Sequence, residues 1–149
     1  MKREERPLWR CPECAHTFVT RNLWHSCGKY TLDHHFADKP AFVRKIFDAY
    51  VTAVRRFGPF KVEPQKTRIV FQVRVRFAGG HALKSGFRGT MWLKERCPGP
   101  PVDRIDDFDG DYVHSFLLRR PEDLTPSLVE RLGRAYRIGC QDHLREPRT

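Results

Sequence analysis

The sequence predicts an α+β fold in which an antiparallel sheet of about four or five strands carries helices on one face. Three observations predict it: an apolar stripe with helical spacing comes first, alternating polar and apolar segments follow, and a second helical stripe lies near the C-terminal end. Strands joined by short connections pair antiparallel, and helices before and after such a run favour α+β over alternating α/β. We expect this domain to span residues 36–142, after a small module at residues 7–30.

The first helix is expected to begin near Asp38 and Pro40 and to end at Gly58-Pro59. Asp is a good N-cap, and Pro suits the first turn because its missing N–H has no partner there. Between these limits the apolar residues recur at helical spacing, at Phe42, Val43, Ile46, Phe47, Tyr50, Val54 and Phe57. Residues 31–39, before this helix, are predicted to be a polar connector.

The hydrophobic period then changes to two. Residues 69–77 alternate between apolar and polar side chains and are predicted to form one strand, and Gly79-Gly80 is a turn signal. Residues 83–94 alternate in the same way and are predicted to form a second strand. The two strands therefore each have one buried face and one polar face.

The last third of the chain is predicted to contain a hairpin and a helix. A short strand is expected over residues 102–105, a turn at Asp109-Gly110 and another strand over residues 112–118. The final helix is predicted over residues 125–138, because a threonine N-cap followed by proline is typical of a helix start.

A cluster of potential metal ligands lies near the N-terminus. Cys11 and Cys14 form a Cys-x-x-Cys pair, and His25 and Cys27 form a His-x-Cys pair. Zinc prefers a tetrahedral shell of thiolate and imidazole, and a shell filled by four protein ligands is structural. The alternatives are a cluster of buried thiols and a redox Cys-x-x-Cys, and the redox motif is expected in a βαβ context that the pattern here lacks. The sequence therefore predicts a zinc ion that stabilises the module, with His16 in a loop beside it.

The chain is strongly basic, with a net charge of +10 and a pI of about 9.8. Such charge favours anionic partners, although a solvated basic surface is the alternative. No apolar run approaches the ~18–20 residues of a membrane span, and the charged N-terminus does not resemble a secretory signal. An odd number of cysteines with a metal-like cluster fits a reducing compartment. We expect a cytoplasmic protein with no membrane partner.

Basic residues alternate with the apolar residues of the two predicted strands. If the apolar sides face the helices, the opposite face gathers cations and one aromatic ring, from Arg68, Gln72, Arg74, Arg76, Lys84, Arg88, Trp92 and Lys94. Cations neutralise phosphates, and an exposed Trp stacks on bases. The alternative is that these charges only keep the sheet soluble and its edges blunted. The pattern predicts a face for nucleic acid or another anionic partner.

A second candidate site combines Lys66 with His114 and Tyr112 as a polar corner for an anionic ligand. A structural role is the more common one for a single strand histidine. Aspartates between residues 103 and 111 superficially resemble a calcium loop but lack its spacing and closing Glu. An acidic turn explains them better, and it is able to pair with the basic face of the same chain.

Several segments resemble an uncharacterised bacterial family of small proteins with a domain of unknown function. The resemblance rests on residues 8–14, 24–28, 30–36, 66–67, 112–114 and 121–124 and covers most of residues 8–139. Ala15 departs from the pattern, because this kind of Cys-x-x-Cys turn often has Gly there. The resemblance implies a zinc-binding segment joined to an α+β domain and supplies no activity.

From these patterns we expect a nucleic-acid-binding accessory protein. The alternative is a module that binds a small ligand or a protein partner without catalytic activity. An enzyme would need convergent titratable groups in a cleft, and the sequence does not display such a set. We therefore favour either of the two binding functions over an enzymatic function.

Overall fold

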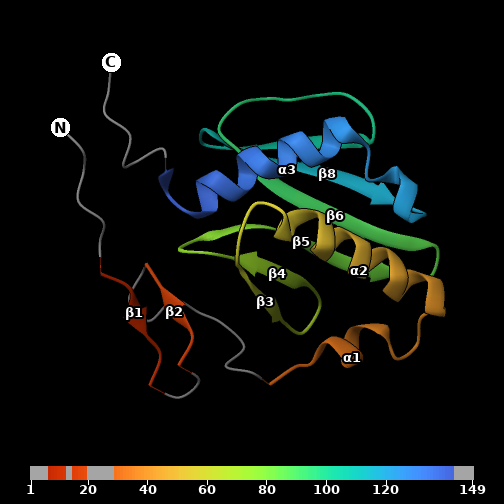
Figure 1. The fold of residues 1–149 in the computed structure, drawn as a ribbon, viewed down its shortest axis with the longest axis horizontal. Coiled ribbons are helices and arrows are strands. Elements are labelled where there is room, and N and C mark those ends of the chain that lie inside the picture. Colours follow the sequence, from red (N-terminus) through yellow and green to blue (C-terminus); the bar gives the residue numbers. More distant parts are fainter. Residues whose placement is uncertain (1–6, 13–14, 20–28, 143–149) are drawn as a thin grey trace.

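The computed structural model describes residues 7–12, 15–19 and 29–142 and has an α+β fold (Figure 1). Its main body is a six-stranded antiparallel sheet, which has more strands than the sequence predicts. In spatial order the strands are β3 (Lys61–Pro64), β4 (Ile69–Gln72), β5 (Arg76–Leu83), β6 (Gly86–Leu93), β8 (Asp111–Leu118) and β7 (Val102–Phe108). Two further short strands, β1 (Trp9–Arg10) and β2 (Thr17–Phe18), pair antiparallel outside this sheet and are called the β1–β2 ribbon.

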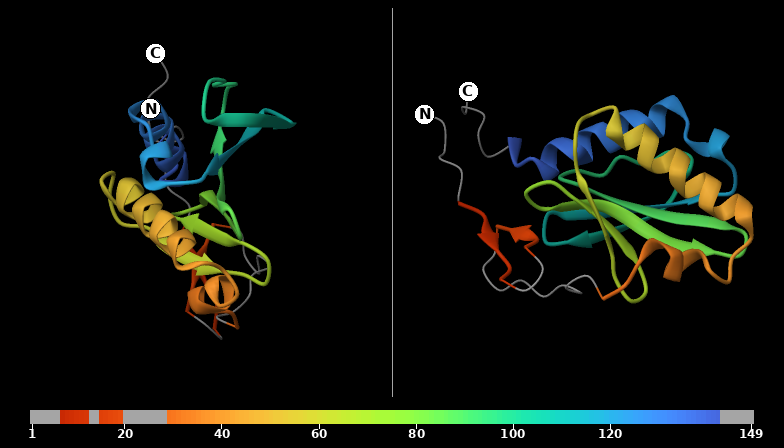
Figure 2. Two further views of the ribbon diagram at one scale, coloured as in Figure 1. Left: turned by 90° about the vertical axis from the view of Figure 1, so that its right-hand side faces the viewer. Right: turned by 60° about the horizontal axis from the view of Figure 1, so that its bottom comes forward.

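Two long helices, α2 (Ala41–Arg55) and α3 (Pro126–Gly139), cover one face of the sheet, as Figure 2 shows. α2 packs on β6, and α3 packs on β5 and β6. Both bury most of the predicted apolar stripes, although Phe42 and Phe57 of the first stripe are exposed. The core is rich in aromatic rings, including Phe47, Tyr50, Phe60, Phe71, Phe77, Phe87, Phe116 and Tyr136. Within the described residues, no helix combines the length and the apolar character needed to cross a bilayer.

The starts of these helices agree with the sequence signals in all but one detail. The Thr125 hydroxyl accepts a hydrogen bond from the N–H of Leu128 at 3.2 Å and so caps α3 as predicted. At α2 the N-cap position is Pro40. Asp38 instead pairs with the ammonium of Lys39 at 2.8 Å, so the prediction that Asp38 caps this helix is wrong.

The predicted polar connector contains a short helix, α1 (Leu32–Phe36). The Thr31 hydroxyl accepts from the N–H of His34 at 3.2 Å, which is a local N-cap that the sequence analysis overlooks. Phe36 lies on the ring of Phe47 with centroids 5.1 Å apart. This contact attaches α1 to the core. A single 3-10 turn, η1 (Pro121–Asp123), precedes α3.

The strand predicted over residues 69–77 is wrong, because the chain reverses in the middle of it. β4 ends at Gln72 and β5 begins at Arg76. The carbonyl oxygen of Gly139, at the end of α3, accepts from the N–H groups of Arg74 and Val75 at 2.9 and 3.1 Å. The alternation of residue types continues through this turn and therefore gives no sign of it. The acceptor that stabilises the reversal comes from a helix far along the chain.

The turn predicted at Gly79-Gly80 is also wrong, since both glycines lie inside β5. Their φ angles are +150° and +146°. A Cβ on Gly79 would lie 2.1 Å from the carbonyl oxygen of Ile69, and one on Gly80 would lie 2.1 Å from that of Arg88. The glycines therefore permit neighbouring strands to approach closely on both sides. The reversal comes later, between Leu83 and Gly86, which are register partners.

The hairpin at the other edge of the sheet confirms the turn expected at Asp109-Gly110. These residues connect β7 to β8 and have φ angles of +56° and +91°. β7 continues to Phe108 and is longer than the predicted strand at residues 102–105. Positive φ at both central positions is typical of the two-residue turn that matches strand twist.

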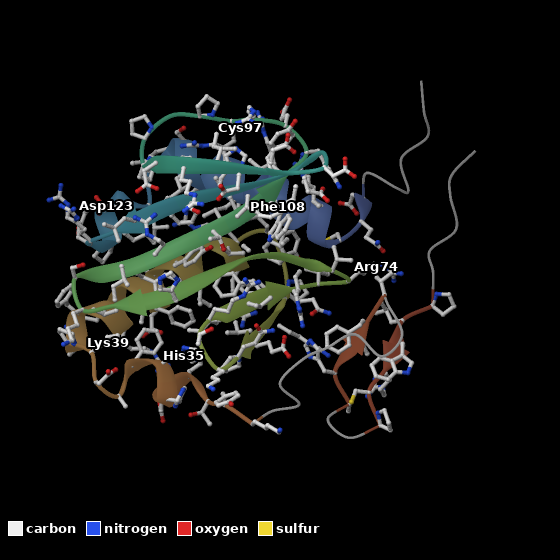
Figure 3. The ribbon with its side chains drawn as sticks, turned by 180° about the vertical axis from the view of Figure 1, so that it is seen from behind. His35, Lys39, Arg74, Cys97, Phe108 and Asp123 are labelled. Carbon is white, nitrogen blue, oxygen red and sulfur yellow. The ribbon has the colours of Figure 1, made fainter. Side chains whose placement is uncertain are left out.

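The β1–β2 ribbon lies beside the end of the sheet that carries Arg74 and the β4–β5 turn (Figure 3). Gln72, only 1% exposed, donates from its amide nitrogen to the carbonyl oxygen of Thr17 at 2.6 Å. Its amide oxygen lies 3.2 Å from Nε2 of His16. Beside it, the Arg76 guanidinium lies 5.7 Å from the centre of the Phe18 ring. The face of the sheet away from α2 and α3 is called the open face (Figure 2).

Candidate nucleic-acid interface

Two cationic side chains flank a histidine on the open face. His81 on β5 is the register partner of Arg88 on β6. Arg68 directly precedes Ile69, the register partner of Gly80, and so lies across from His81 on the neighbouring strand. Burial lowers the pKa of His81, and the positive charges of Arg88 and Arg68 lower it further. We call Arg68, His81 and Arg88 the basic row.

Aspartates of the β7–β8 hairpin pair with two members of the predicted basic face. The Arg88 guanidinium forms a two-bonded pair with the Asp103 carboxylate, at 2.9 and 3.0 Å. This pair lowers the pKa of Asp103. Lys94 is paired with Asp111. The acidic segment therefore neutralises part of the face, as one interpretation of the sequence anticipated.

Two further arginines of the predicted set lie near the β4–β5 turn. The Arg76 guanidinium lies 3.4 Å from the Glu63 carboxylate and is partly covered by the β1–β2 ribbon. Burial lowers the pKa of Arg76, while the charge of Glu63 opposes this shift. Arg74 donates from Nε to the side-chain oxygen of Gln141 at 2.9 Å. Both are therefore engaged within the chain and lie outside the basic row.

Exposed cations surround the end of the sheet where the basic row lies. β4 begins, β5 ends and β8 ends at this end, because Ile69 pairs with Gly80 and Phe87 pairs with Leu118. The segments at this end carry four exposed cations, namely Lys66, Arg68, Lys84 and Arg119. In the described part of the chain their charged groups make no hydrogen bond or ion pair. These cations are available to an external anion.

The predicted aromatic residue lies at the other end of the open face. The Trp92 ring lies 5.9 Å from the ring of Phe108, which is 57% exposed. Phe108 lies between Asp107 and Asp109 at the tip of the β7–β8 hairpin. Aspartates therefore flank Phe108 of this aromatic pair, and the structure does not bring the pair together with the basic row.

The second candidate site is not assembled. Lys66 precedes β4, whereas His114 is on β8, with β5 and β6 between these strands. His114 is fully buried, and its Nε2 accepts from the N–H of Cys97 at 2.9 Å. Its other ring nitrogen therefore carries the proton and donates to the carbonyl oxygen of Tyr112 at 3.0 Å. Burial lowers the pKa of this ring, so His114 is a neutral structural residue that positions the loop after β6.

Arg131 of α3 holds the same loop from the other side. Its guanidinium, on a residue only 6% exposed, donates to the carbonyl oxygens of Cys97, Gly99 and Pro100 at 2.9, 3.1 and 2.9 Å. It also donates from Nε to the carbonyl oxygen of Ser127 at 3.2 Å. The sequence offered no signal for this role, because Arg131 lies in an ordinary helical pattern.

The sequence analysis also misses His81 and Arg119 as members of the basic end of the sheet. His81 was hidden because Gly79-Gly80 suggested a turn at the start of its strand. Arg119 follows the last strand, and its position beside the β5–β6 turn depends on the pairing of β6 with β8. Correct strand bounds are the signal that would have found both.

Of the predicted zinc ligands, only Cys11 is among the described residues. Cys14, His25 and Cys27 lie outside them. Cys11 is 4% exposed and follows β1; its N–H donates to the carbonyl oxygen of His16 at 2.9 Å. Within residues 7–12, 15–19 and 29–142, no three His, Cys, Asp or Glu side chains are grouped to hold a metal.

Comparisons with known proteins give the family and no activity. None of the curated proteins and none of the solved structures matches the chain. A family model described as a domain of unknown function (DUF5655) matches residues 32–139, from the start of α1 to the end of α3. The match takes in the six-stranded sheet and its helices but not the β1–β2 ribbon. The chain therefore belongs to the DUF5655 family.

Proposed function

We propose that this protein is a nucleic-acid-binding accessory protein whose contact surface is the basic row together with the exposed cations at the same end of the sheet. The observation that supports it is the proximity of Arg68 and Arg88 to His81 on a face without helix cover. Asp103 offsets the charge of Arg88, whereas Arg68 makes no ion pair within the described residues. A phosphate backbone running along this end of the sheet would supply the negative charge that Arg68 lacks.

Electrostatics sets the character of the proposed binding. Arg88 is already paired with Asp103, so a phosphate has to compete with a carboxylate for it. Lys66 and Arg68 have no such competitor among the described residues, and Lys84 lies near the carboxylate of Asp38, which is itself paired with Lys39. Backbone contacts carry no sequence information directly, so we expect modest, salt-dependent binding with little sequence preference.

Binding of fluorescent single-stranded RNA and DNA to the full chain tests this proposal. The double variant Arg68→Gln/Lys84→Gln should bind about tenfold more weakly at low salt or worse. The slope of log affinity against log salt should become shallower by about 1.5, because two phosphate contacts are lost.

The matched control is Lys45→Gln/Arg56→Gln, which removes the same net charge from exposed positions of α2 and its C-terminal end. It should retain most of the binding. Equal losses in the two double variants would reduce the effect to net charge and reject the proposed surface, as would the absence of binding at low salt.

We also propose that zinc stabilises the N-terminal module through Cys11, Cys14, His25 and Cys27. Support comes from the loop after β1, where the Cys11 carbonyl oxygen accepts from the N–H of Ala15 at 2.8 Å. Ala15 has a φ of +63°, the left-handed conformation in which a Cys-x-x-Cys turn often has Gly. A buried thiol at such a turn is suited to thiolate ligation.

Metal analysis of the purified full chain tests the zinc proposal. We expect one zinc per chain, and its loss in Cys11→Ser because one of four ligands is removed. Cys97→Ser is the matched control, since Cys97 lies in the loop after β6, and it should keep the metal. Retention of zinc by Cys11→Ser, or protein that neither contains nor takes up zinc, would contradict it.

A further inference from the structure

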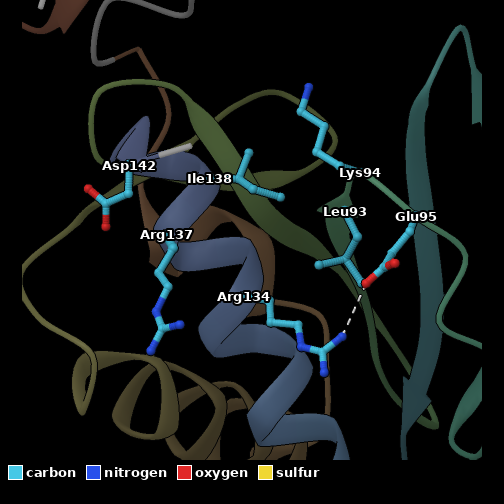
Figure 4. A pocket seen from close by; sticks show the side chains of 7 residues that line it. All are labelled: Leu93, Lys94, Glu95, Arg134, Arg137, Ile138 and Asp142. Carbon is cyan, nitrogen blue, oxygen red and sulfur yellow. Dashed lines mark hydrogen bonds and ion pairs between the residues drawn. The ribbon is translucent and has the colours of Figure 1, made fainter. Parts of the chain in front are cut away.

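A pocket of about 330 Å³ lies between the end of β6 and the C-terminal half of α3 (Figure 4). Its volume is within the range of small-molecule sites. Seven residues line it, namely Leu93, Lys94, Glu95, Arg134, Arg137, Ile138 and Asp142. Neither the predicted nucleic-acid face nor the Lys66–His114 corner includes it as a site; only Lys94 is shared with the former.

The floor of this pocket is apolar. Leu93 is 2% exposed and belongs to the core, and Ile138 is partly buried against the same core. Ile138 and Arg134 are four positions apart on α3 and therefore share one side of the helix. An apolar group that entered here would be removed from water on contact with both side chains.

The rim carries one cation that no described residue pairs with. Arg134 is paired with Glu95 at 3.3 Å and with Glu130 at 3.1 Å. Lys94 is paired with Asp111. The exposed Arg137 guanidinium makes no hydrogen bond or ion pair in the part of the chain that the structure describes. The pocket thus offers an apolar floor beside a guanidinium that is unpaired within the described residues.

We propose that this pocket binds a small amphipathic anion, a compact apolar body that bears one carboxylate. The apolar body lies on Leu93 and Ile138, and the carboxylate accepts hydrogen bonds from Arg137. A guanidinium presents donors in a fork that matches two carboxylate oxygens, which fixes the orientation of the ligand. A second anionic group is disfavoured because Glu95 and Asp142 line the same pocket. This site is independent of the proposed nucleic-acid interface.

The test uses octanoate as the probe and amide NMR of the full chain as the readout. Octanoate at millimolar concentration should shift amides around Leu93, Glu95 and Ile138. Acetate, which lacks the apolar body, and 1-octanol, which lacks the charge, should bind about tenfold more weakly or worse. Arg137→Gln should weaken octanoate binding by about tenfold or more, because a charge-assisted hydrogen bond is lost.

Lys45→Gln is the matched control, because it removes one exposed positive charge from α2 and should leave octanoate binding unchanged. Arg137 is exposed, so Arg137→Gln should fold normally, and its amide spectrum verifies this. Shifts scattered over the surface, equal binding of octanol, or unchanged affinity in Arg137→Gln would each overturn the proposal.

Discussion

Gly79→Ala should destabilise the protein by about 3 kcal/mol or more. Gly79 has a φ of +150°, a conformation that residues with a side chain rarely adopt. An alanine Cβ there would lie 2.1 Å from the carbonyl oxygen of Ile69 and 3.0 Å from the Cα of Val70. Both atoms belong to the backbone of β4, so relief requires that β4 and β5 separate in the centre of the sheet. Urea denaturation of the purified variant measures the effect.

Gly110→Ala separates the two contributions to this loss. Gly110 also has a positive φ, of +91°, but nothing lies within 4 Å of the Cβ that alanine would add. It therefore isolates the backbone term, which we expect to cost about 1–2 kcal/mol. If Gly79→Ala were no more destabilising than Gly110→Ala, the close approach of β4 to β5 would be refuted.

Arg131→Met should destabilise the protein by about 3 kcal/mol. The substitution leaves three loop carbonyl oxygens, of Cys97, Gly99 and Pro100, without the donors that Arg131 supplies. The loop should also loosen, because the bond from the Cys97 N–H to buried His114 then holds it without the help of Arg131. Urea denaturation measures the stability, and faster amide hydrogen exchange at Cys97 reports the loosened loop.

The matched control for Arg131→Met is Arg134→Met on the same helix. The Arg134 side chain is 49% exposed and is paired with exposed Glu95 and Glu130. Exposed ion pairs contribute little, so this variant should lose less than about 1 kcal/mol. A loss of that size in Arg131→Met as well would mean that the loop does not depend on its buried guanidinium.

The sequence predicted best those features that depend on neighbouring residues. The stripe that includes Phe47 and Tyr50 placed α2, and the Thr125 cap placed α3, because helix periodicity and capping are local. Prediction from the sequence failed where a group that is distant in the sequence determines the backbone conformation. The reversal between β4 and β5 needs the Gly139 carbonyl. The glycines of β5 are required because the backbones of the two neighbouring strands leave no room for a Cβ atom.

The same distinction applies to the candidate sites. Alternation placed Arg88 and Trp92 on the open face correctly, because the face follows from the period of a strand. The residues that these side chains contact could not be predicted from the alternation. Asp103 reaches Arg88 only because the spatial order of strands is β6, β8, β7, and this order is not encoded in any local pattern. The pocket beside Arg137 has the same origin, since it needs α3 placed across the end of β6.

The buried amide of Gln72 has a consequence for how the N-terminal part of the chain is presented. By bonding to Thr17 and lying against His16, it joins positions more than fifty residues apart, across the limit of the family match at residue 32. The ribbon is thus hydrogen-bonded to the sheet at β4, so a molecule that the ribbon engaged would meet the sheet beside Gln72.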